Sequence, residues 1–483
     1  MTVRASSDET GTGLVASARL EVLDLYGVPY RVGAAPSGQL ESLSAPEGRA
    51  IYWPSGGKRG AGWSVIDGIP LFAPIVPDDE LERLGRTVGA AWEPCVAIVD
   101  RDGRQVSSVR RAPDGSVLLP FDPNRAATSL LREHYLALTS SGGARLAKDI
   151  ARRAYYRVRP IVPRRAQIAL RRRFTEVQQR ATFPSWPTET ALHDLREWML
   201  AVVQHAWREP LPQIGWWPDG ARWAVVLTHD VERARGYGFV EQLVSIEARY
   251  GMRSAWYFVP ERDYRVDDEL VRRLTEDGSE VCVHGLRHDG RDLQPGVFEK
   301  RLPAMRSYAE RWGSIGFRAP STQRSPEAIA ALGCDHDSSY SDVARFEPQG
   351  GGSCSWLPFF FDDVVELPIT MPMDHTLFEL LGHTDEKIWV EKAGFLRDRG
   401  GMALMLTHPD YLQNETTRSA YEAFLAHVAR DATAWHALPR DVSDWWRRRA
   451  ASRLTREGDA WVVQGPAWDA SVVSVDRPLP FVA

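Results

Sequence analysis

The sequence predicts an α/β protein built around a parallel sheet, because strand-like and helix-like segments alternate through its second half. Alternation of this kind is typical of successive β-α units, and this many units favour closure into a barrel or a near-barrel. Polar residues also stand at most of the expected strand ends, where such barrels gather their chemistry. We therefore expect a barrel over residues 211–450 with a reactive site at its rim. The residues at these ends are Asp230, Glu232, His284, His288, Arg318, Asp337 and His408.

The barrel elements follow one another in order along the chain. The expected strands are Ala224–Thr228, Ala255–Val259, Val281–His284, Gly316–Arg318, Cys334–Ser338, Val364–Pro368 and Ala403–Thr407. The expected helices are Phe239–Tyr250, Glu269–Asp277, Val297–Trp312, Pro326–Leu332, Glu386–Arg399 and Thr417–Ala434. Short apolar runs indicate the strands, and apolar residues at helical spacing indicate the helices.

The rest of the chain predicts three smaller units. Residues 1–125 hold short apolar runs separated by Gly, Pro, Asp and Ser, which indicates a small, mainly β domain. Residues 126–210 change to helical spacing and include an Arg-rich stretch, Arg145–Arg173, which predicts a helical, basic connector. Residues 451–483 are expected to form a C-terminal β hairpin tail.

Composition and charge exclude some classes of function. The chain has 483 residues, of which 43% are hydrophobic and 25% charged, as in ordinary soluble globular proteins. Its formal net charge of −5 gives no electrostatic basis for binding nucleic acid. No stretch approaches the ~18 consecutive apolar residues of a membrane span, so we expect no transmembrane segment. The basic connector could touch an anionic membrane surface, or it could simply be a solvated bridge between domains.

Cysteine usage and the first residues predict a cytoplasmic protein. The four cysteines are widely spaced and form no CxxC pair, which is typical of unpaired thiols in a reducing compartment. Residues Met1–Ala18 lack both the basic and the apolar region of a secretory signal.

Histidines and carboxylates at two expected strand ends predict a metal site. His284 and His288 stand four residues apart where the apolar run Val281–Val283 ends, so they should occupy a turn at a strand end. Asp230 and Glu232 follow another apolar run. Two imidazoles and one carboxylate make a set that suits a divalent ion of the zinc type and leaves positions open for water and substrate. A His pair at this spacing inside a helix would be a much weaker signal.

A hydrolytic site also needs a base that takes a proton from water and an acid that protonates the leaving group. Asp230 is the candidate base, and His408 is the candidate acid. Arg318 is cationic at all relevant pH and could hold Asp230 ionised and oriented through a bidentate pair. If either residue occurred without the other motifs, Arg318 would be interpreted as part of a salt bridge and His408 as a helix cap or a buried imidazole. The catalytic roles of the two residues are therefore inferred from their occurrence together with the other motifs.

Together these motifs resemble those of the NodB-type polysaccharide deacetylases, also called carbohydrate esterase family 4. The resemblance covers Trp216–Trp446, about half the chain, in the family's motif order. It implies a distorted (β/α) barrel that removes acetyl groups from N-acetylated or O-acetylated sugars with a zinc or cobalt ion. The family's usual Thr-Phe-Asp-Asp appears as Thr228-His229-Asp230-Val231-Glu232, which resembles a divergent branch with the motif Asp-Val-Asp. This match makes Asp230 the base and Glu232 a metal ligand, with Asp230 as the alternative ligand.

The other family motifs have counterparts in this chain. His-Ser-x-x-His appears as His284-Gly285-Leu286-Arg287-His288, with both ligands kept. Arg-x-Pro-x-Gly appears as Arg318-Ala319-Pro320-Ser321-Thr322, where a backbone N–H near Ser321 could polarise the acetyl oxygen. Asp337-Ser338-Ser339-Tyr340 resembles the family's Asp-Ser-Ser, and Met405-Leu406-Thr407-His408 resembles Leu-x-x-His, whose His is the acid.

Four further side chains have roles that the sequence leaves less defined. Ser321, Asp337 and Asp374 are the expected substrate-binding residues, although Asp374 could instead belong to a loop turn. His229 stands where the family has Phe, and it is interpreted as a packing residue or a partner of the ligands, with metal ligation as the alternative.

The leading interpretation is a metal-dependent hydrolase that uses metal-activated water to remove an acetyl group from an N-acetylated carbohydrate or glycoconjugate. Zinc is the expected ion, with cobalt or nickel as alternatives. A first alternative is a hydrolase of a non-sugar amide, of the ureide or formamide type, on the same fold. A second is a catalytically inactive carbohydrate-binding barrel, which the departures at Glu232 and Ser321-Thr322 favour.

Overall fold

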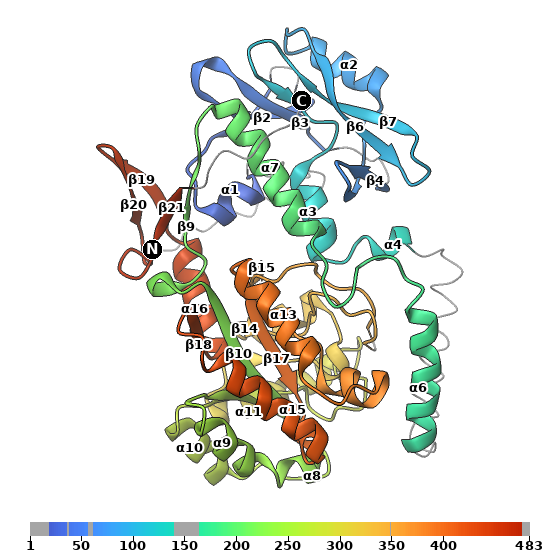
Figure 1. Cartoon of the computed structure of the whole chain (residues 1–483), viewed down its shortest axis with the longest axis vertical. Helices are drawn as coiled ribbons and strands as arrows, with labels where there is room; N and C mark the ends of the chain where they lie inside the picture. Colours follow the sequence, from blue (N-terminus) through green and yellow to red (C-terminus); the bar gives the residue numbers. More distant parts are fainter. Residues whose placement is uncertain (1–18, 36–37, 57–60, 140–163, 348, 476–483) are drawn as a thin grey trace.

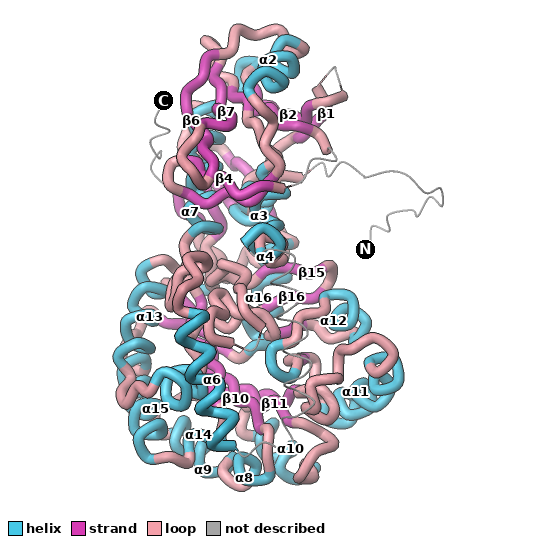
Figure 2. Tube along the Cα trace, turned by 90° about the vertical axis from the view of Figure 1, so that its right-hand side faces the viewer, coloured by secondary structure: helices cyan, strands magenta, loops and turns pink. Residues whose placement is uncertain are grey.

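The chain folds into two lobes, which lie one above the other in the computed structural model (Figure 1). The structure describes residues 19–35, 38–56, 61–139, 164–347 and 349–475. The N-terminal lobe is built on one sheet, and the larger C-terminal lobe is built on a second, curled sheet (Figure 2). Each lobe has its own large cluster of buried apolar side chains.

The N-terminal sheet has eight strands in the order β1-β2-β3-β8-β7-β6-β4-β5. The strands are β1 (Val32–Ala34), β2 (Leu40–Ser44), β3 (Ala50–Pro54), β4 (Gly62–Ile66), β5 (Ile69–Ala73), β6 (Glu93–Asp100), β7 (Gln105–Arg111) and β8 (Val117–Leu118). Neighbouring strands run antiparallel, apart from the parallel pair β3 and β8. Asp67 and Gly68 join β4 to β5 and both have positive φ, which is the conformation that makes Asp-Gly a favoured two-residue hairpin turn.

The region predicted as a connector supplies part of the helices of this lobe. The helices are α1 (Glu21–Tyr26), η1 (Pro46–Gly48), α2 (Asp78–Arg86), α3 (Pro123–Leu131), α4 (Leu136–Thr139) and α7 (Ala191–Trp207). The connector helix α6 (Arg164–Gln178) lies instead beside the C-terminal lobe (Figure 2). Side chains of α3 and α7, such as Leu130 and Leu195, lie in the same core as the sheet. The N-terminal core therefore extends past the boundary expected at residue 125. Residues 140–163 of the predicted connector lie outside the described residues.

The C-terminal sheet is ordered β15-β16-β14-β13-β12-β11-β10-β17, and β18 also pairs with β10. Its strands are β10 (Trp223–Val231), β11 (Ser254–Phe258), β12 (Glu280–Val283), β13 (Gly316–Phe317), β14 (His336–Asp337), β15 (Phe359–Phe361), β16 (Val364–Glu366), β17 (Met402–Thr407) and β18 (Ala434–Ala437). All pairs are parallel except β15 with β16. The expected strands all have counterparts here, whereas β15 and β18 are additional. This is the mixed α/β architecture that the sequence predicts for residues 211–450.

The sheet curls far enough for its two ends to meet. After β16, Thr370 and Met371 donate backbone hydrogen bonds to the carbonyl of Leu404 in β17. The Thr370 hydroxyl also donates to Met402 O at 2.5 Å and accepts from Leu404 N at 2.9 Å. The strands therefore form a distorted barrel that irregular backbone closes between β16 and β17.

Helices cover the outside of this barrel (Figure 1). They are η3 (Pro218–Gly220), α8 (Ala234–Tyr237), α9 (Val240–Ala248), α10 (Asp268–Glu276), α11 (Phe298–Trp312), η4 (Pro320–Thr322), α12 (Pro326–Leu332), the π-helix η5 (His375–Leu381), α13 (Lys387–Asp398), α14 (Pro409–Leu412), α15 (Glu415–Val428) and α16 (Pro439–Ala450). The helix expected over Thr417–Ala434 ends at Val428, because the chain turns there and Ala434 begins β18.

The two lobes are joined by polar contacts as well as by the chain. The Glu133 carboxylate accepts from Gly352 N at 2.5 Å, and the Tyr135 hydroxyl donates to Gly352 O at 2.7 Å. The N-terminal lobe thereby holds the long loop between β14 and β15. The end of the chain forms the hairpin of β19 (Arg453–Glu457) and β20 (Ala460–Gln464), and β21 (Val473–Val475) pairs with β9 (Pro212–Ile214). Within the described ranges, no helix is long and apolar enough to cross a membrane.

Candidate metal centre

The predicted site residues lie at the carboxyl ends of neighbouring barrel strands. Asp230 is near the end of β10 and Glu232 follows it, while His284 follows β12 and His408 follows β17. β10 pairs with both β11 and β17, and β12 pairs with β11. Parallel strands that pair in this way bring their carboxyl ends to one edge of the sheet, which is why residues far apart in sequence meet there.

The turn that carries both histidines depends on Gly285. This residue has φ +62°, and a Cβ there would lie 2.5 Å from Pro320 Cγ and 2.6 Å from Asp292 Oδ2. The Asp292 carboxylate accepts the backbone N–H of His288 at 3.1 Å and fixes the far side of the turn. Only glycine fits this tight, left-handed position, and the turn folds His288 back beside His284.

Glu232, His284 and His288 meet as a three-residue set whose ligand atoms all lie within 4.8 Å of one another. His284 Nδ1 lies 2.9 Å from the carbonyl oxygen of Arg318; donating there directs the Nε2 lone pair into the site. Within the described residues, His284 Nε2 and His288 Nδ1 are buried without a hydrogen-bond partner. His288 Nε2 is also buried, and it lies 2.8 Å from Glu232 Oε1, within the distance of an ion pair. Buried imidazoles that converge on a carboxylate fit the donor set of a zinc-type ion.

The protonation states of these groups also suit an ion. Burial lowers the pKa of His284 to about 4, and the nearby Asp230 carboxylate offsets this only in part. The imidazole is therefore neutral at neutral pH, which is the form that binds metals. Burial acts to raise the pKa of Glu232, but the adjacent His288 outweighs it, and the pKa falls well below its usual value. The carboxylate is therefore ionised.

Arg318 anchors Asp230 from inside the barrel. Its Nη1 donates to Asp230 Oδ1 at 2.9 Å, and the remaining guanidinium N–H groups donate to Thr228 and Ser338. The contact with Asp230 is thus a single bond, not the bidentate pair expected from the sequence, because the other donors are already used. Burial acts to raise the pKa of Asp230, but His284 and Arg318 outweigh it and lower the pKa, so Asp230 is an ionised carboxylate.

His408 is held by Asp374, a partner that sequence reasoning missed. Asp374 Oδ1 lies 2.7 Å from His408 Nδ1, and Asp374 Oδ2 accepts the His408 backbone N–H at 2.7 Å. Burial acts to lower the pKa of His408, but the Asp374 carboxylate outweighs it and raises the pKa to about 10. His408 is therefore an imidazolium whose Nε2 lies 3.9 Å from Glu232 Oε1, at the edge of the metal centre.

The three expected substrate-binding residues occupy different depths. Asp374 is fully buried behind His408, and Asp337 is fully buried in β14. The Asp337 carboxylate accepts from the Ser339 hydroxyl at 2.8 Å, and Ser339 Oγ accepts from Ala319 N at 2.8 Å. Asp337 therefore supports the segment after Arg318 from below, while Ser321 on that segment is partly exposed.

His229 faces away from the metal centre, as strand alternation requires. Its Nε2 lies 2.6 Å from Glu247 Oε1, and its Nδ1 lies 2.8 Å from Thr407 Oγ1. Glu247 also accepts from Tyr421 and Ser254 hydroxyls. Successive side chains of a strand point to opposite faces, so a residue beside Asp230 in β10 must point outward. Both ring nitrogens of His229 are engaged in this outer network, which excludes it from the ligand set.

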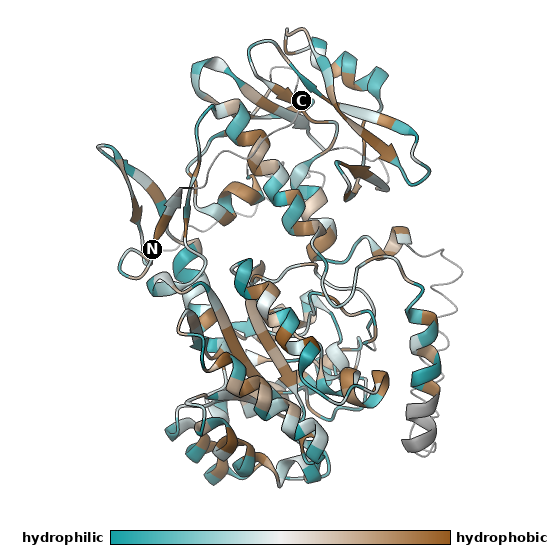
Figure 3. Cartoon of the chain, in the orientation of Figure 1, coloured by the Kyte–Doolittle hydropathy of each residue, from teal (hydrophilic) through white to brown (hydrophobic). Residues whose placement is uncertain are grey.

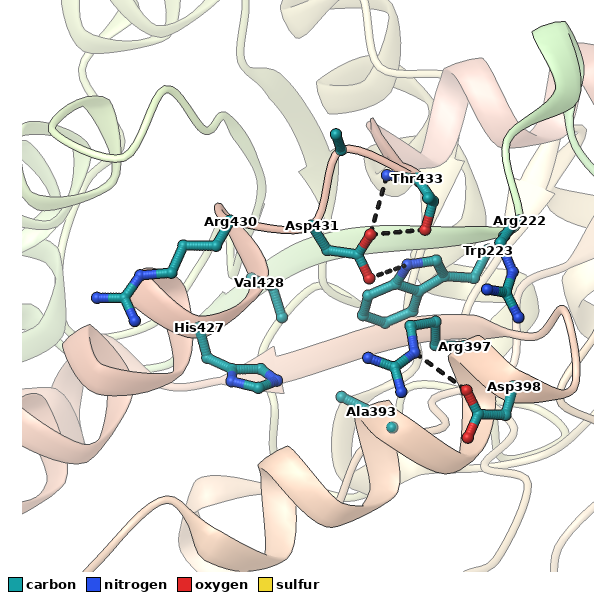
Figure 4. Close-up of a pocket in the computed structure, with 12 residues that line it drawn as sticks. Arg222, Trp223, Ala393, Arg397, Asp398, His427, Val428, Arg430, Asp431 and Thr433 are labelled. Atoms are coloured by element: carbon teal, nitrogen blue, oxygen red, sulfur yellow. Dashed lines mark hydrogen bonds and ion pairs between the residues drawn. The ribbon is translucent and has the colours of Figure 1, made fainter.

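A solvent-open cavity of about 430 Å³ lies at the other end of the same strand (Figure 4). It is lined by Trp223, the first residue of β10, and by residues of α13 and α15 such as Arg397 and His427. Asp431 binds Trp223 and Thr433 there. The cavity is therefore separated from the metal centre by the length of β10.

Comparisons with known proteins give a likeness of fold. No family model matches the chain, and no curated protein matches it in sequence. A Mycobacterium smegmatis protein assigned as a polysaccharide deacetylase is similar over 52% of this chain and 98% of its own, at 20% identity and a TM-score of 0.40. The allantoinase Puue is similar over 48% of this chain and 92% of its own, at 14% identity and a TM-score of 0.38. Peptidoglycan deacetylase PdaC from Bacillus subtilis is similar over 47% of this chain and 94% of its own, at 14% identity and a TM-score of 0.32.

The solved structures similar to this chain thus include polysaccharide deacetylases and carbohydrate esterases of family 4, over about half of its length.

Proposed function

We propose that this chain is a metal-dependent hydrolase that removes an acetyl group from an N-acetylated carbohydrate or glycoconjugate, acting on a carbon–nitrogen bond that is not a peptide bond. The convergence of the buried ring nitrogens of His284 and His288 on the Glu232 carboxylate carries the proposal, because two imidazoles and a carboxylate within 4.8 Å of one another form the donor set of a zinc-type ion, and His284 Nε2 has no hydrogen-bond partner among the described residues. An ionised Asp230 and a protonated His408 stand beside this set and supply the base and the acid that amide hydrolysis needs.

Glu232, His284 and His288 would hold a divalent ion, zinc in the first place and cobalt or nickel as alternatives. When bound, such an ion supplies a Lewis acid for water and for the acetyl carbonyl. Asp230 takes a proton from the attacking water, and Arg318 keeps that carboxylate oriented through its bond to Oδ1. His408 gives its Nε2 proton to the leaving amine while Asp374 holds its Nδ1.

Two other parts of the site have roles toward substrate and metal. The backbone near Ser321 is partly exposed and is proposed to polarise the acetyl oxygen. The alternative in which Asp230 binds the ion is less favoured, since one of its oxygens is already committed to Arg318. Asp230 Oδ2 lies 3.4 Å from His284 Nε2, which places it beside the ligands. Asp337 and Asp374 would act through Ser339 and His408 rather than by touching substrate.

A comparison of substrates and metal content tests this proposal. The purified full chain should hold a zinc-type ion and release acetate from N-acetylglucosamine oligomers. Hydrolysis of ureides or formamides without acetate release would instead support the non-sugar amide alternative. A chain that binds acetylated sugars but neither holds metal at the rim nor turns over any of these amides would be the inactive carbohydrate-binding barrel.

The cellular setting is also a proposal. Cys95, Cys282, Cys334 and Cys354 are all unpaired, which supports a reducing, cytoplasmic location. The connector supports a peripheral contact with anionic lipid. Twelve Arg and Lys residues stand against two Asp and Glu residues between positions 140 and 180, in a chain whose net charge is −5.

Helix α6 is the described part of that basic region (Figure 3). Leu170, Phe174 and Val177 recur at helical spacing, and their exposed fractions are 57%, 44% and 57%. Arg172 donates to Glu379 O at 2.9 Å and so fixes α6 against η5, the helix that Asp374 caps. An exposed apolar row beside arginines suits the interface of an anionic bilayer, and this one stands next to the helix that borders the site.

Vesicle sedimentation of the full chain tests the membrane contact. Binding should require anionic lipid and should weaken strongly when Leu170, Phe174 and Val177 are all changed to Ser. The matched control is Ile315→Ser, which removes another exposed apolar side chain away from α6. Equal binding by the triple variant and the wild type would refute the contact.

A further inference from the structure

A second group of side chains that could hold a metal ion lies before the rim set along the barrel strands. Glu280 begins β12, Cys282 follows two residues later, and His336 begins β14. Their ligand atoms all lie within 4.8 Å of one another, and the side chains are 4%, 0% and 0% exposed. Glu280 and Cys282 stand four and two residues before His284 along the chain, and their set shares no residue with the set at the rim.

The contacts in this cluster are close to those of a ligand shell. Glu280 Oε1 lies 2.8 Å from His336 Nε2 and 3.5 Å from Cys282 Sγ. The ligands of a tetrahedral zinc ion, at about 2.0–2.3 Å from the metal, are about 3.3–3.8 Å apart. The three donor atoms therefore need only small shifts to share one ion. The second oxygen of Glu280 accepts the Arg440 backbone N–H at 2.9 Å, which fixes the orientation of the carboxylate.

Gly316 gives these side chains the space that they occupy. It pairs with His336 in the register of β13 and β14. A Cβ at this position would lie 2.2 Å from His336 Cε1, 2.5 Å from His336 Nε2 and 2.8 Å from Cys282 Sγ. Any residue with a side chain would push the imidazole and the thiol out of their positions. The position of the His336 and Cys282 side chains therefore explains why residue 316 is a glycine.

We propose that Glu280, Cys282 and His336 bind a second divalent ion of the zinc type, through a carboxylate, a thiolate and an imidazole. A doubly charged ion with one carboxylate and one thiolate is electrically neutral as a unit, which is what a fully buried position requires. Such an ion ties β12 to β14 across β13, so its role is to stabilise the amino end of the barrel. The inference is independent of the hydrolase activity proposed above.

Two neighbouring features agree with this site. Tyr257, on the adjacent strand, is paired in register with Cys282, and its buried hydroxyl interacts with the Cys282 thiol. It is thus a candidate fourth donor. A cavity of about 260 Å³ lined by Gly278 and Arg440 lies next to the Glu280 end of the cluster and brings solvent near it. Without an ion, burial raises the pKa of the Cys282 thiol well above its usual value and keeps it protonated.

Cobalt substitution of the full chain tests the site directly, because the two centres differ in sulfur. A thiolate bound to Co²⁺ gives a strong sulfur-to-metal charge-transfer absorption in the near ultraviolet, which the Glu-His-His set cannot give. The wild type stripped of metal should take up two equivalents of Co²⁺ and show this band. Cys282→Ser should take up one equivalent and lose the band, whereas Cys334→Ser, a control outside the cluster, should retain both.

The same measurement separates this proposal from that of the rim. His284→Ala should lose one equivalent of Co²⁺ but keep the band, since its ion is the one without sulfur. A wild type that shows no charge-transfer band at saturating Co²⁺, or a band that survives in Cys282→Ser, would overturn the inference. The cluster would then be a buried Glu280–His336 ion pair beside a protonated thiol. A wild-type spectrum without the band overturns the inference by itself, so this outcome does not depend on the variants folding.

Discussion

Asp374→Asn changes the acid of the proposed reaction without touching the three proposed metal ligands. Asp374 is fully buried, and its two oxygens bind Nδ1 and the backbone N–H of His408. Asn keeps the shape of the side chain but removes its negative charge. Its single oxygen can accept only one of the two hydrogen bonds from His408, because the amide nitrogen that replaces the other oxygen cannot accept one. The variant therefore leaves a buried imidazole that has lost the group stabilising its cationic form.

The size of the effect follows from the pKa of His408. The structure raises it from 6.5 to about 10, mainly because the Asp374 carboxylate outweighs the burial that lowers it. A difference of this size corresponds to roughly 5 kcal/mol in favour of the imidazolium. In Asp374→Asn burial still lowers the pKa of His408 while Glu232 and Asp230 still raise it, so the pKa should fall well below that of the wild type. Above the lowered pKa the acid is deprotonated, and kcat there should fall by up to about 10²–10⁴-fold, the usual contribution of a positioned general acid.

The pH dependence of kcat measures this prediction. A general acid is active below its pKa, so the alkaline limb of the profile should move to lower pH in the variant. Metal content should stay at the wild-type level. Asp385→Asn is the matched control, because Asp385 is partly exposed and pairs with Lys387 on the surface. An unshifted alkaline limb, or a loss of metal in Asp374→Asn, would refute the role given to His408.

Three further changes test other parts of the site. His284→Ala should remove the ion at the rim and reduce turnover to below about 1% of the wild type. The control His427→Ala replaces an exposed histidine and should change neither the metal content nor the turnover. Turnover without metal at the rim would contradict the assignment. Arg318→Lys should lower the free energy of unfolding by roughly 2–4 kcal/mol, because Lys cannot replace the hydrogen bonds to Asp230, Thr228 and Ser338. Denaturant titrations measure this change, and an unchanged midpoint would count against the buried network. Gly285→Ala should weaken metal binding at the rim in calorimetry far more than Gly296→Ala, which has a similar positive φ but open space around it; equal effects would show that the fit against Pro320 is unimportant.

The barrel could be predicted from the sequence because its elements have strong local patterns. The helix expected over Pro326–Leu332 has these bounds in the structure, and the predicted strand Ala224–Thr228 lies within β10. β18 was missed since it is short and only partly buried, and its pairing with the first half of β10 is a long-range contact. The boundary at residue 125 stays a prediction, because helical spacing does not reveal which core a helix joins, and side chains of α7 pack with the N-terminal sheet.

The candidate site divides in the same way between local and distant signals. His284 and His288 belong to one turn, so their proximity could be inferred from their spacing and from the end of a strand. The orientation of His229 could also have been inferred, because side chains alternate along β10 and Asp230 faces inward. The partnership of Asp374 with His408 joins residues 34 positions apart through the packing of η5. No pattern in a single sequence encodes such a contact, nor the one between Glu280 and His336.

Diffraction at the zinc absorption edge from crystals of the full chain, grown or soaked with zinc, tests the central claim most directly. Our account predicts an anomalous peak at the rim of the barrel, within about 2.0–2.2 Å of a Glu232 oxygen, His284 Nε2 and one ring nitrogen of His288. A map without a peak between these three side chains, at a zinc concentration that saturates the chain in solution, would contradict it.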